Sequence, residues 1–233
     1  MRLALIPGFS QPASTWAPVI DALPAFIASD SHPLEVPDGL DFVATADALG
    51  TVGGPGIYVG YSMGGRLALR LALDRPDLVH ALVLVSATPG FDDPPTRSVR
   101  AEQDRARAER IHTMGVGAFL EEWLAQPLFA TLPRDEAMFD QRTATMSADR
   151  LAHQMTTLGQ GAMEPLGDRL SELTMPTTIV AGRADSRYVE IGRAMAARIP
   201  VATLVELDGG HALPLEQPAT LSKVIARVHE ATA

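Results

Sequence analysis

The stretch Gly60-Tyr61-Ser62-Met63-Gly64-Gly65 contains the pattern G-x-S-x-G. An apolar run at 56–59 precedes it and an Ala/Leu/Arg-rich segment at 66–73 follows it, so we predict a strand, a tight turn and a helix. A serine in this context sits on a strained turn with its hydroxyl exposed above the sheet, which makes Ser62 the candidate nucleophile. An unreactive serine in a glycine-rich turn is the alternative, and the flanking strand and helix disfavour it.

Composition limits the classes of protein to consider. The chain has 233 residues, 46% of them apolar, which suits one α/β domain with a large core. The absence of cysteine excludes disulfides, a thiolate nucleophile and zinc–thiolate sites. A net charge of −9 disfavours nucleic acid as a partner. No apolar run approaches the roughly 18 residues that span a bilayer, and no signal peptide is evident. We therefore expect a cytoplasmic monomer or homodimer that does not bind membranes.

Apolar runs and helical patterns alternate along most of the chain. Strands are predicted at 3–6, 34–36, 57–59, 81–86, 177–181 and 203–207. Helices are predicted at 16–28, 42–49, 65–74, 189–199 and 217–231. This alternation predicts an α/β fold with a doubly wound, mostly parallel sheet.

Strand-like runs disappear between Asp92 and Pro165. Charged segments there predict helices at 97–113, 117–125, 134–145 and 148–158. We expect a single domain with a core of 1–91 and 166–233 and a helical cap at 92–165. The cap would be inserted after the strand that ends near Ser86 and would lie over the carboxyl ends of the strands, where ligands bind in such sheets.

An acid and a base follow two later strands, in the chain order that a serine nucleophile requires. Asp185 comes just after the run at 177–181, and His211 comes just after the run at 203–207. We predict that His211 takes the proton of Ser62 and that Asp185 orients the imidazole. Asp208 is the competing acid, but it lies too close to His211 in sequence for this arrangement. The alternative for Asp185 is a helix N-cap.

The loop after the first strand, Pro7-Gly8-Phe9, is where a second oxyanion donor is expected. Gly8 would let the backbone approach the substrate, and the amides of Phe9 and Met63 are the candidate donors. Proton transfer and oxyanion stabilisation need no metal or organic cofactor, and we expect none.

Further motifs accompany this framework. They are Tyr61-Ser62 with Arg66, Pro89-Gly90 before an arginine-rich helix, Trp123 before Gln126-Pro127-Leu128-Phe129, the pair Gln141-Arg142, Gly182-Arg183-Ala184-Asp185-Ser186-Arg187-Tyr188, and Gly210-His211 with Glu216-Gln217-Pro218. Over almost its whole length the chain resembles the α/β-hydrolase superfamily. Within that superfamily it resembles the menaquinone-pathway lyases that form 2-succinyl-6-hydroxy-2,4-cyclohexadiene-1-carboxylate.

The resemblance implies a lyase that eliminates pyruvate from a polycarboxylate. Carboxylates would then be held by Arg66, Arg97, Arg100 and Arg142, while Tyr61 and Trp123 shape the pocket. Charge agrees with an anionic small-molecule substrate, because residues 97–110 contain five arginines against three acidic residues in an otherwise acidic chain. The alternative for these arginines is a solvated helix face that pairs with its own acidic residues.

The chain also departs from the lyase pattern. Pro7 replaces a histidine before the oxyanion glycine, Pro214 replaces a second histidine near His211, and the loop at 36–39 differs. A related serine hydrolase, either a carboxylesterase or a C–C bond hydrolase acting through an acyl-serine, would show the same changes. A catalytically inactive ligand-binding relative is a third hypothesis, and the intact set of Ser62, Asp185 and His211 argues against it.

Overall fold

The structure, a computed structural model, describes residues 1–232. In this part of the chain six strands form one sheet in the order β2-β1-β3-β4-β5-β6, and every neighbouring pair is parallel. The strands are β1 (Leu3–Ile6), β2 (Ser31–Pro33), β3 (Gly56–Tyr61), β4 (Val79–Val85), β5 (Thr177–Gly182) and β6 (Ala202–Leu207). The predicted doubly wound sheet is confirmed.

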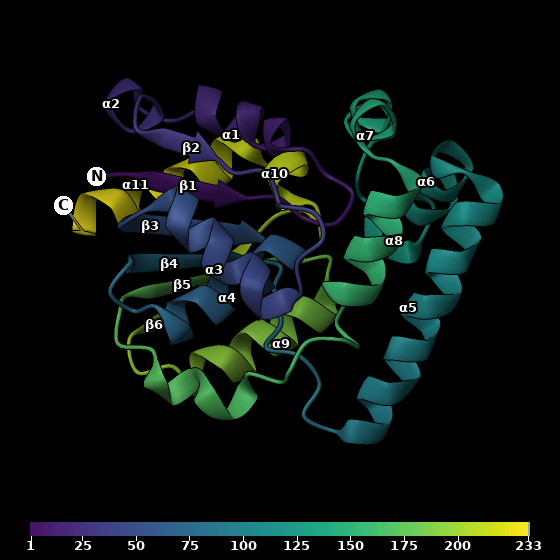
Figure 1. Cartoon of the computed structure of the whole chain (residues 1–233). Helices are drawn as coiled ribbons and strands as arrows, with labels where there is room; N and C mark the ends of the chain where they lie inside the picture. Colours follow the sequence, from purple (N-terminus) through teal and green to yellow (C-terminus); the bar gives the residue numbers. More distant parts are fainter. Residues whose placement is uncertain (233) are drawn as a thin grey trace.

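Helices cover both faces of the sheet (Figure 1). One face packs against α3 (Phe42–Gly53), α4 (Met63–Asp74) and α9 (Ser186–Ala196). The other packs against α1 (Ala17–Asp21) and α11 (Pro218–Thr232). Alternate residues of β1, β3 and β4 enter the two cores, as the period of two in a strand requires. The short helices α2 (Ala25–Ala28) and α10 (Leu213–Glu216) complete this part.

Four helices follow β4 and lie together beyond one end of the sheet (Figure 1). They are α5 (Pro94–Met114), α6 (Val116–Leu124), α7 (Phe139–Thr145) and α8 (Ala148–Thr157). They share a small apolar core of their own, which includes Ile111, Phe119 and Leu151. We call α5 to α8 the cap helices. The boundaries predicted for a separate cap, 92–165, stay a prediction.

Several predicted elements were wrong in detail; the helix expected at 134–145, for example, begins only at Phe139. The helix expected at 16–28 is divided into a 3₁₀ turn (Ala13–Trp16), α1 and α2, because Pro24 cannot continue a helix. The second strand lies at Ser31–Pro33 instead of 34–36. Leu34 and Val36 are buried, which explains their apolar pattern, but the pairing with β1 ends at Pro33.

Two further 3₁₀ turns are present, at Pro127–Phe129 and at Gly167–Glu172. None of the described helices is long and apolar enough to cross a membrane.

Candidate active site

Ser62 occupies a sharp turn between β3 and α4. Its backbone has φ 50° and ψ −108°, a conformation that L-residues seldom adopt. The neighbouring glycines make the turn possible: a Cβ on Gly64 would collide with the carbonyl oxygens of Ile6 and Pro7, and one on Gly65 would lie 2.6 Å from Cβ of Ala87. The turn presents the Ser62 hydroxyl at the carboxyl end of the sheet, half-buried in a cavity.

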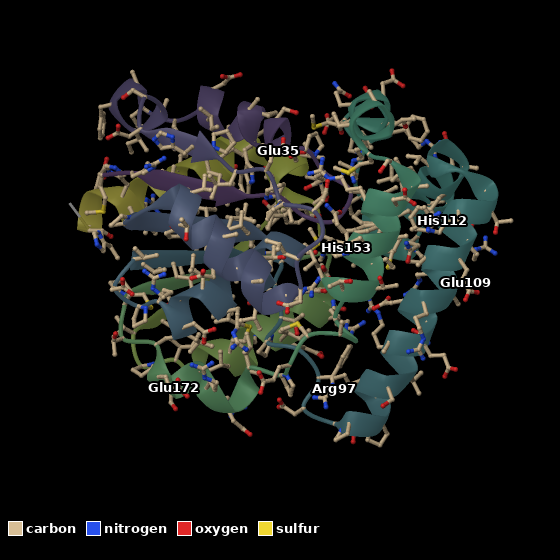
Figure 2. The ribbon with its side chains drawn as sticks, in the orientation of Figure 1. Glu35, Arg97, Glu109, His112, His153 and Glu172 are labelled. Carbon is tan, nitrogen blue, oxygen red and sulfur yellow. The ribbon has the colours of Figure 1, made fainter. Side chains whose placement is uncertain are left out.

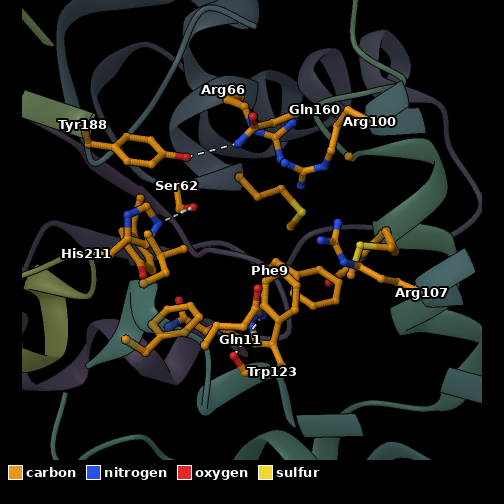
Figure 3. A pocket seen from close by; sticks show the side chains of 18 of the residues that line it. Phe9, Gln11, Ser62, Arg66, Arg100, Arg107, Trp123, Gln160, Tyr188 and His211 are labelled. Carbon is orange, nitrogen blue, oxygen red and sulfur yellow. Dashed lines mark hydrogen bonds between the residues drawn. The ribbon is translucent and has the colours of Figure 1, made fainter. Parts of the chain in front are cut away.

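His211 meets Ser62 at this end of the sheet (Figure 3), and Asp185 contacts the far side of the imidazole. Ser62 Oγ lies 3.1 Å from Nε2 of His211, and Nδ1 of His211 lies 2.7 Å from Oδ2 of Asp185. Both His211 and Asp185 are buried. A hydroxyl, an imidazole and a carboxylate in this order can move a proton from serine to histidine. Asp185 is also the N-cap of α9, where its side chain accepts the Tyr188 amide. It therefore fills the alternative role of a helix cap as well.

Backbone and side-chain contacts fix His211. The amides of Gly210 and Ala212, on either side of it, both donate to the carboxylate of Glu216, at 2.7 and 2.9 Å. The hydroxyl of Ser86 donates to the His211 carbonyl at 2.9 Å. Asp208, the competing acid, is exposed and forms an ion pair with Arg183 instead. We did not predict from the sequence that Ser86 and Glu216 would position His211.

The two predicted oxyanion donors face no protein acceptor in the described residues. Met63 begins α4, and its amide is one of the free donors at the start of that helix. In the loop after β1, the amides of Gly8 and Ser10 donate to side-chain oxygens of Gln11 and Gln154, at 3.0 and 3.2 Å. The Phe9 amide between them remains free, so the amides of Phe9 and Met63 can both donate to a ligand oxygen that develops negative charge.

A cavity of about 360 Å³ opens in front of Ser62. Figure 3 shows Arg66 and Arg100 bordering it on one side and Phe9 and Trp123 on the other. Within the described residues, five arginines and no acidic residue line it; the arginines are Arg66, Arg100, Arg107, Arg142 and Arg187. The cavity is therefore cationic within an acidic protein, which favours an anionic ligand.

Two of these arginines are buried and have no carboxylate partner among residues 1–232. Arg66 donates through Nη1 to the Leu158 carbonyl at 2.7 Å and lies over the ring of Phe42. Arg142 donates to the Ala137 carbonyl at 2.8 Å and to Ser10 Oγ at 2.9 Å, and its Nη2 has no acceptor in residues 1–232. Burial lowers the pKa of each guanidinium to about 10, so both stay charged at neutral pH.

The arginines of α5 divide between two settings. Arg100 and Arg107 both pair with the buried Asp104, at 2.8 and 3.0 Å, and line the cavity. Arg97 does not line it, which corrects the expectation that Arg97 reaches the substrate. It lies near the start of α5 (Figure 2), one turn before Arg100 and outside the cavity. Arg107 was missed, although its spacing of seven from Arg100 places the two on one helix face.

Aromatic side chains form another part of the cavity wall. Trp123 packs against Phe9, with ring centroids 4.8 Å apart, and the Tyr61 ring lies 5.6 Å from that of His211. Tyr61 also fills the space beside Gly8, where a Cβ would lie 2.7 Å from the ring. Both predicted wall residues, Tyr61 and Trp123, line the cavity.

Comparison with known proteins gives a consistent set of relatives. The family model described as alpha/beta hydrolase family matches residues 3–224. A protein of Klebsiella pneumoniae named 2-succinyl-6-hydroxy-2,4-cyclohexadiene-1-carboxylate synthase is 27% identical over 97% of this chain and 92% of its own length. A Bacillus subtilis protein provisionally given the same name is 31% identical over 72% of this chain, and the match spans 63% of that relative.

Solved structures agree with this relationship. The structure of MenH from S. aureus superposes with a TM-score of 0.90 and 25% identity, over 99% of this chain and 94% of that one. A thermophilic esterase from Thermogutta terrifontis gives a TM-score of 0.77 at 22% identity, over 100% and 90% of the two chains, which is a likeness of fold alone.

Proposed function

This chain belongs to the alpha/beta hydrolase family, and on that premise we propose that it is a pyruvate-eliminating lyase. Its product would be 2-succinyl-6-hydroxy-2,4-cyclohexadiene-1-carboxylate, the compound in the names of its relatives. The observation that most supports this proposal is the cavity before Ser62, which five arginines and no acidic residue line in the described part of the chain. A substrate with several carboxylates needs such a site to bind an acidic protein.

In the proposed mechanism Ser62, His211 and Asp185 form a proton relay. His211 takes the Ser62 proton through the 3.1 Å contact, and the serine oxygen removes a proton from substrate carbon. Asp185 stabilises the imidazolium through the 2.7 Å contact. The electron pair left on carbon forms a new double bond, and the C–O bond to the enolpyruvyl group breaks. The leaving enolate takes the proton that His211 holds, and the enolpyruvate so formed tautomerises to pyruvate.

The free amides of Phe9 and Met63 would stabilise negative charge that develops on a substrate oxygen during this step. Arg66 and Arg142 are the proposed carboxylate ligands, since both are buried, charged and without an acidic partner. Arg100, which Asp104 holds, would bind at the cap side of the cavity. Arg97 lies outside the cavity and is left out of the proposal.

A serine hydrolase that acts through an acyl-Ser62 is the second candidate. The half-buried Ser62 hydroxyl and the two free amides also suit attack on an ester carbonyl. The cationic cavity disfavours it, because a neutral ester has no need of two buried arginines.

The test is incubation of the purified protein with the lyase substrate, with pyruvate release followed by a coupled assay. Release by the wild type but not by Ser62→Ala supports the lyase. Hydrolysis of p-nitrophenyl esters without any pyruvate selects the hydrolase. Absence of both activities would leave the inactive relative as the remaining hypothesis.

A further inference from the structure

Gln154 is a buried glutamine on α8, and only half of its amide has a protein partner. It is 2% exposed and lines the cavity. Its Oε1 accepts the Ser10 amide at 3.2 Å. That amide can only donate, so the oxygen of Gln154 must face Ser10 and the orientation of the side-chain amide is fixed. Nε2 has no acceptor in the described residues.

A second unpartnered donor belongs to Arg142, which contacts the same residue. Nη1 of Arg142 donates to Ser10 Oγ at 2.9 Å, so Arg142 and Gln154 both contact Ser10. Nη2 of Arg142, like Nε2 of Gln154, lacks an acceptor within residues 1–232. Of the described residues with an unpartnered buried side-chain donor, only Arg142 and Gln154 line the cavity. Native proteins rarely leave such donors unpaired, so a ligand oxygen is the expected partner here.

The chemistry of the two donors identifies the ligand class. Arg142 is charged at neutral pH, and a carboxylate offers two oxygens that can accept from a guanidinium and an amide together. A neutral carbonyl would leave the buried charge of Arg142 uncompensated. The site therefore favours a carboxylate over an uncharged group.

We propose that Gln154 is a specificity-determining residue whose Nε2 binds a substrate carboxylate beside Nη2 of Arg142, while its Oε1 fixes the loop that carries the Phe9 amide. The identity of the substrate rests on the function proposed above; the carboxylate site itself does not. Gly8 and Ser10, on either side of Phe9, are held by Gln11 and Gln154. One side chain thus connects substrate binding with the oxyanion donor.

The decisive variant is Gln154→Glu, which keeps an oxygen for the Ser10 amide but replaces the donor with a negative charge. Binding of succinate, a simple dicarboxylate, is measured by isothermal titration calorimetry. We expect the dissociation constant to rise about tenfold or more, because a hydrogen bond to a charged group is lost.

Gln160→Glu is the matched control for added charge. Gln160 lines the same cavity, but its Nε2 already donates to the Tyr188 hydroxyl at 3.1 Å. Gln160→Glu should weaken succinate binding less than Gln154→Glu does. Equal effects of the two variants, or wild-type affinity in Gln154→Glu, would overturn the proposal.

Gln154→Met tests the same site without adding charge. It removes both halves of the amide, so succinate affinity should fall in this variant as well. These readouts separate the two proposals. Tight succinate binding that depends on Gln154, without pyruvate release, contradicts the lyase and leaves the carboxylate site standing. Pyruvate release by Gln154→Glu with the KM of the wild type contradicts the carboxylate site and leaves the lyase standing.

Discussion

Nδ1 of His211 lies 2.7 Å from Oδ2 of Asp185, and both side chains are buried beneath the cavity. The two residues follow neighbouring parallel strands, β6 and β5. A hydrogen bond joins the loops that follow these strands: the Arg183 amide donates to the Leu207 carbonyl at 2.8 Å. A Cβ on Gly182 would collide with the Gly210 carbonyl, so this approach of the loops requires glycine.

Asp185→Asn should lower the turnover number by about 10⁴-fold, because asparagine presents the wrong partner to the imidazole and disturbs its tautomer. The fold should persist, since the asparagine oxygen can still accept the Tyr188 amide. Asp208→Asn is the matched control, because Asp208 is exposed and pairs only with Arg183. Steady-state kinetics on both variants checks this prediction, and similar losses in the two would refute it.

Arg66→Met should raise KM for an anionic substrate by about 10- to 100-fold while changing KM for a neutral ester less than about threefold. The reason is that Arg66 is charged, buried and unpaired with any acid. Arg70→Met, one turn further along α4, is the control, since Arg70 pairs with Asp74 and Glu164 outside this cavity. A common effect on both substrates would make Arg66 structural.

Binding of succinate should be constant from pH 7 to about 9 and weaken as the pH rises through about 10. Burial lowers the pKa of Arg66 and Arg142 to about 10, and deprotonation removes the charge that attracts a carboxylate. The carboxylate itself is ionised throughout this range. Titration calorimetry at stepped pH measures the effect, and unchanged affinity at pH 11 would contradict it.

Unfolding should not cause that loss of binding. The two guanidinium groups release their protons at a lower pH in the folded chain than in the unfolded chain, because burial lowers the pKa of each to about 10. Above about pH 10 the unfolded chain therefore holds more protons than the folded chain, and these groups make folding more favourable as the pH rises there. Circular dichroism at each pH provides the check.

Gly64→Ala should destabilise the protein by about 1–3 kcal/mol and lower activity, because the new methyl group meets backbone oxygens of Ile6 and Pro7 that cannot move aside. Gly117→Ala is the control. A Cβ there meets open space in helix α6, so stability should stay the same or rise by up to about 1 kcal/mol. Urea unfolding of both variants measures the difference. Equal stabilities would mean that the turn does not require glycine at 64.

The sequence predicted the sheet and the meeting of Ser62, Asp185 and His211 because each of the three follows a strand that a local pattern reveals. It could not predict which arginines face the cavity, since that depends on where α5 crosses the end of the sheet. Arg97 and Arg107 share a helix face with Arg100, yet only Arg107 lies within reach.

Gln154 gave no signal at all in the sequence. A glutamine on an amphipathic helix is usually a surface residue, and its burial follows from the packing of α8 against the loop after β1. The second strand, which lies at 31–33, was predicted at 34–36 for a related reason. Apolar residues at 34 and 36 are buried after the strand has ended, and burial alone does not identify a strand.

The most direct test of the proposed lyase is the rate of pyruvate release from the polycarboxylate substrate, compared between the wild type and Ser62→Ala in parallel preparations. We expect kcat/KM of at least about 10⁴ M⁻¹ s⁻¹ for the wild type, as for ordinary enzymes on their own substrates, and a loss of about 10³-fold or more in the variant. Pyruvate release by the wild type no faster than by Ser62→Ala would contradict the proposal.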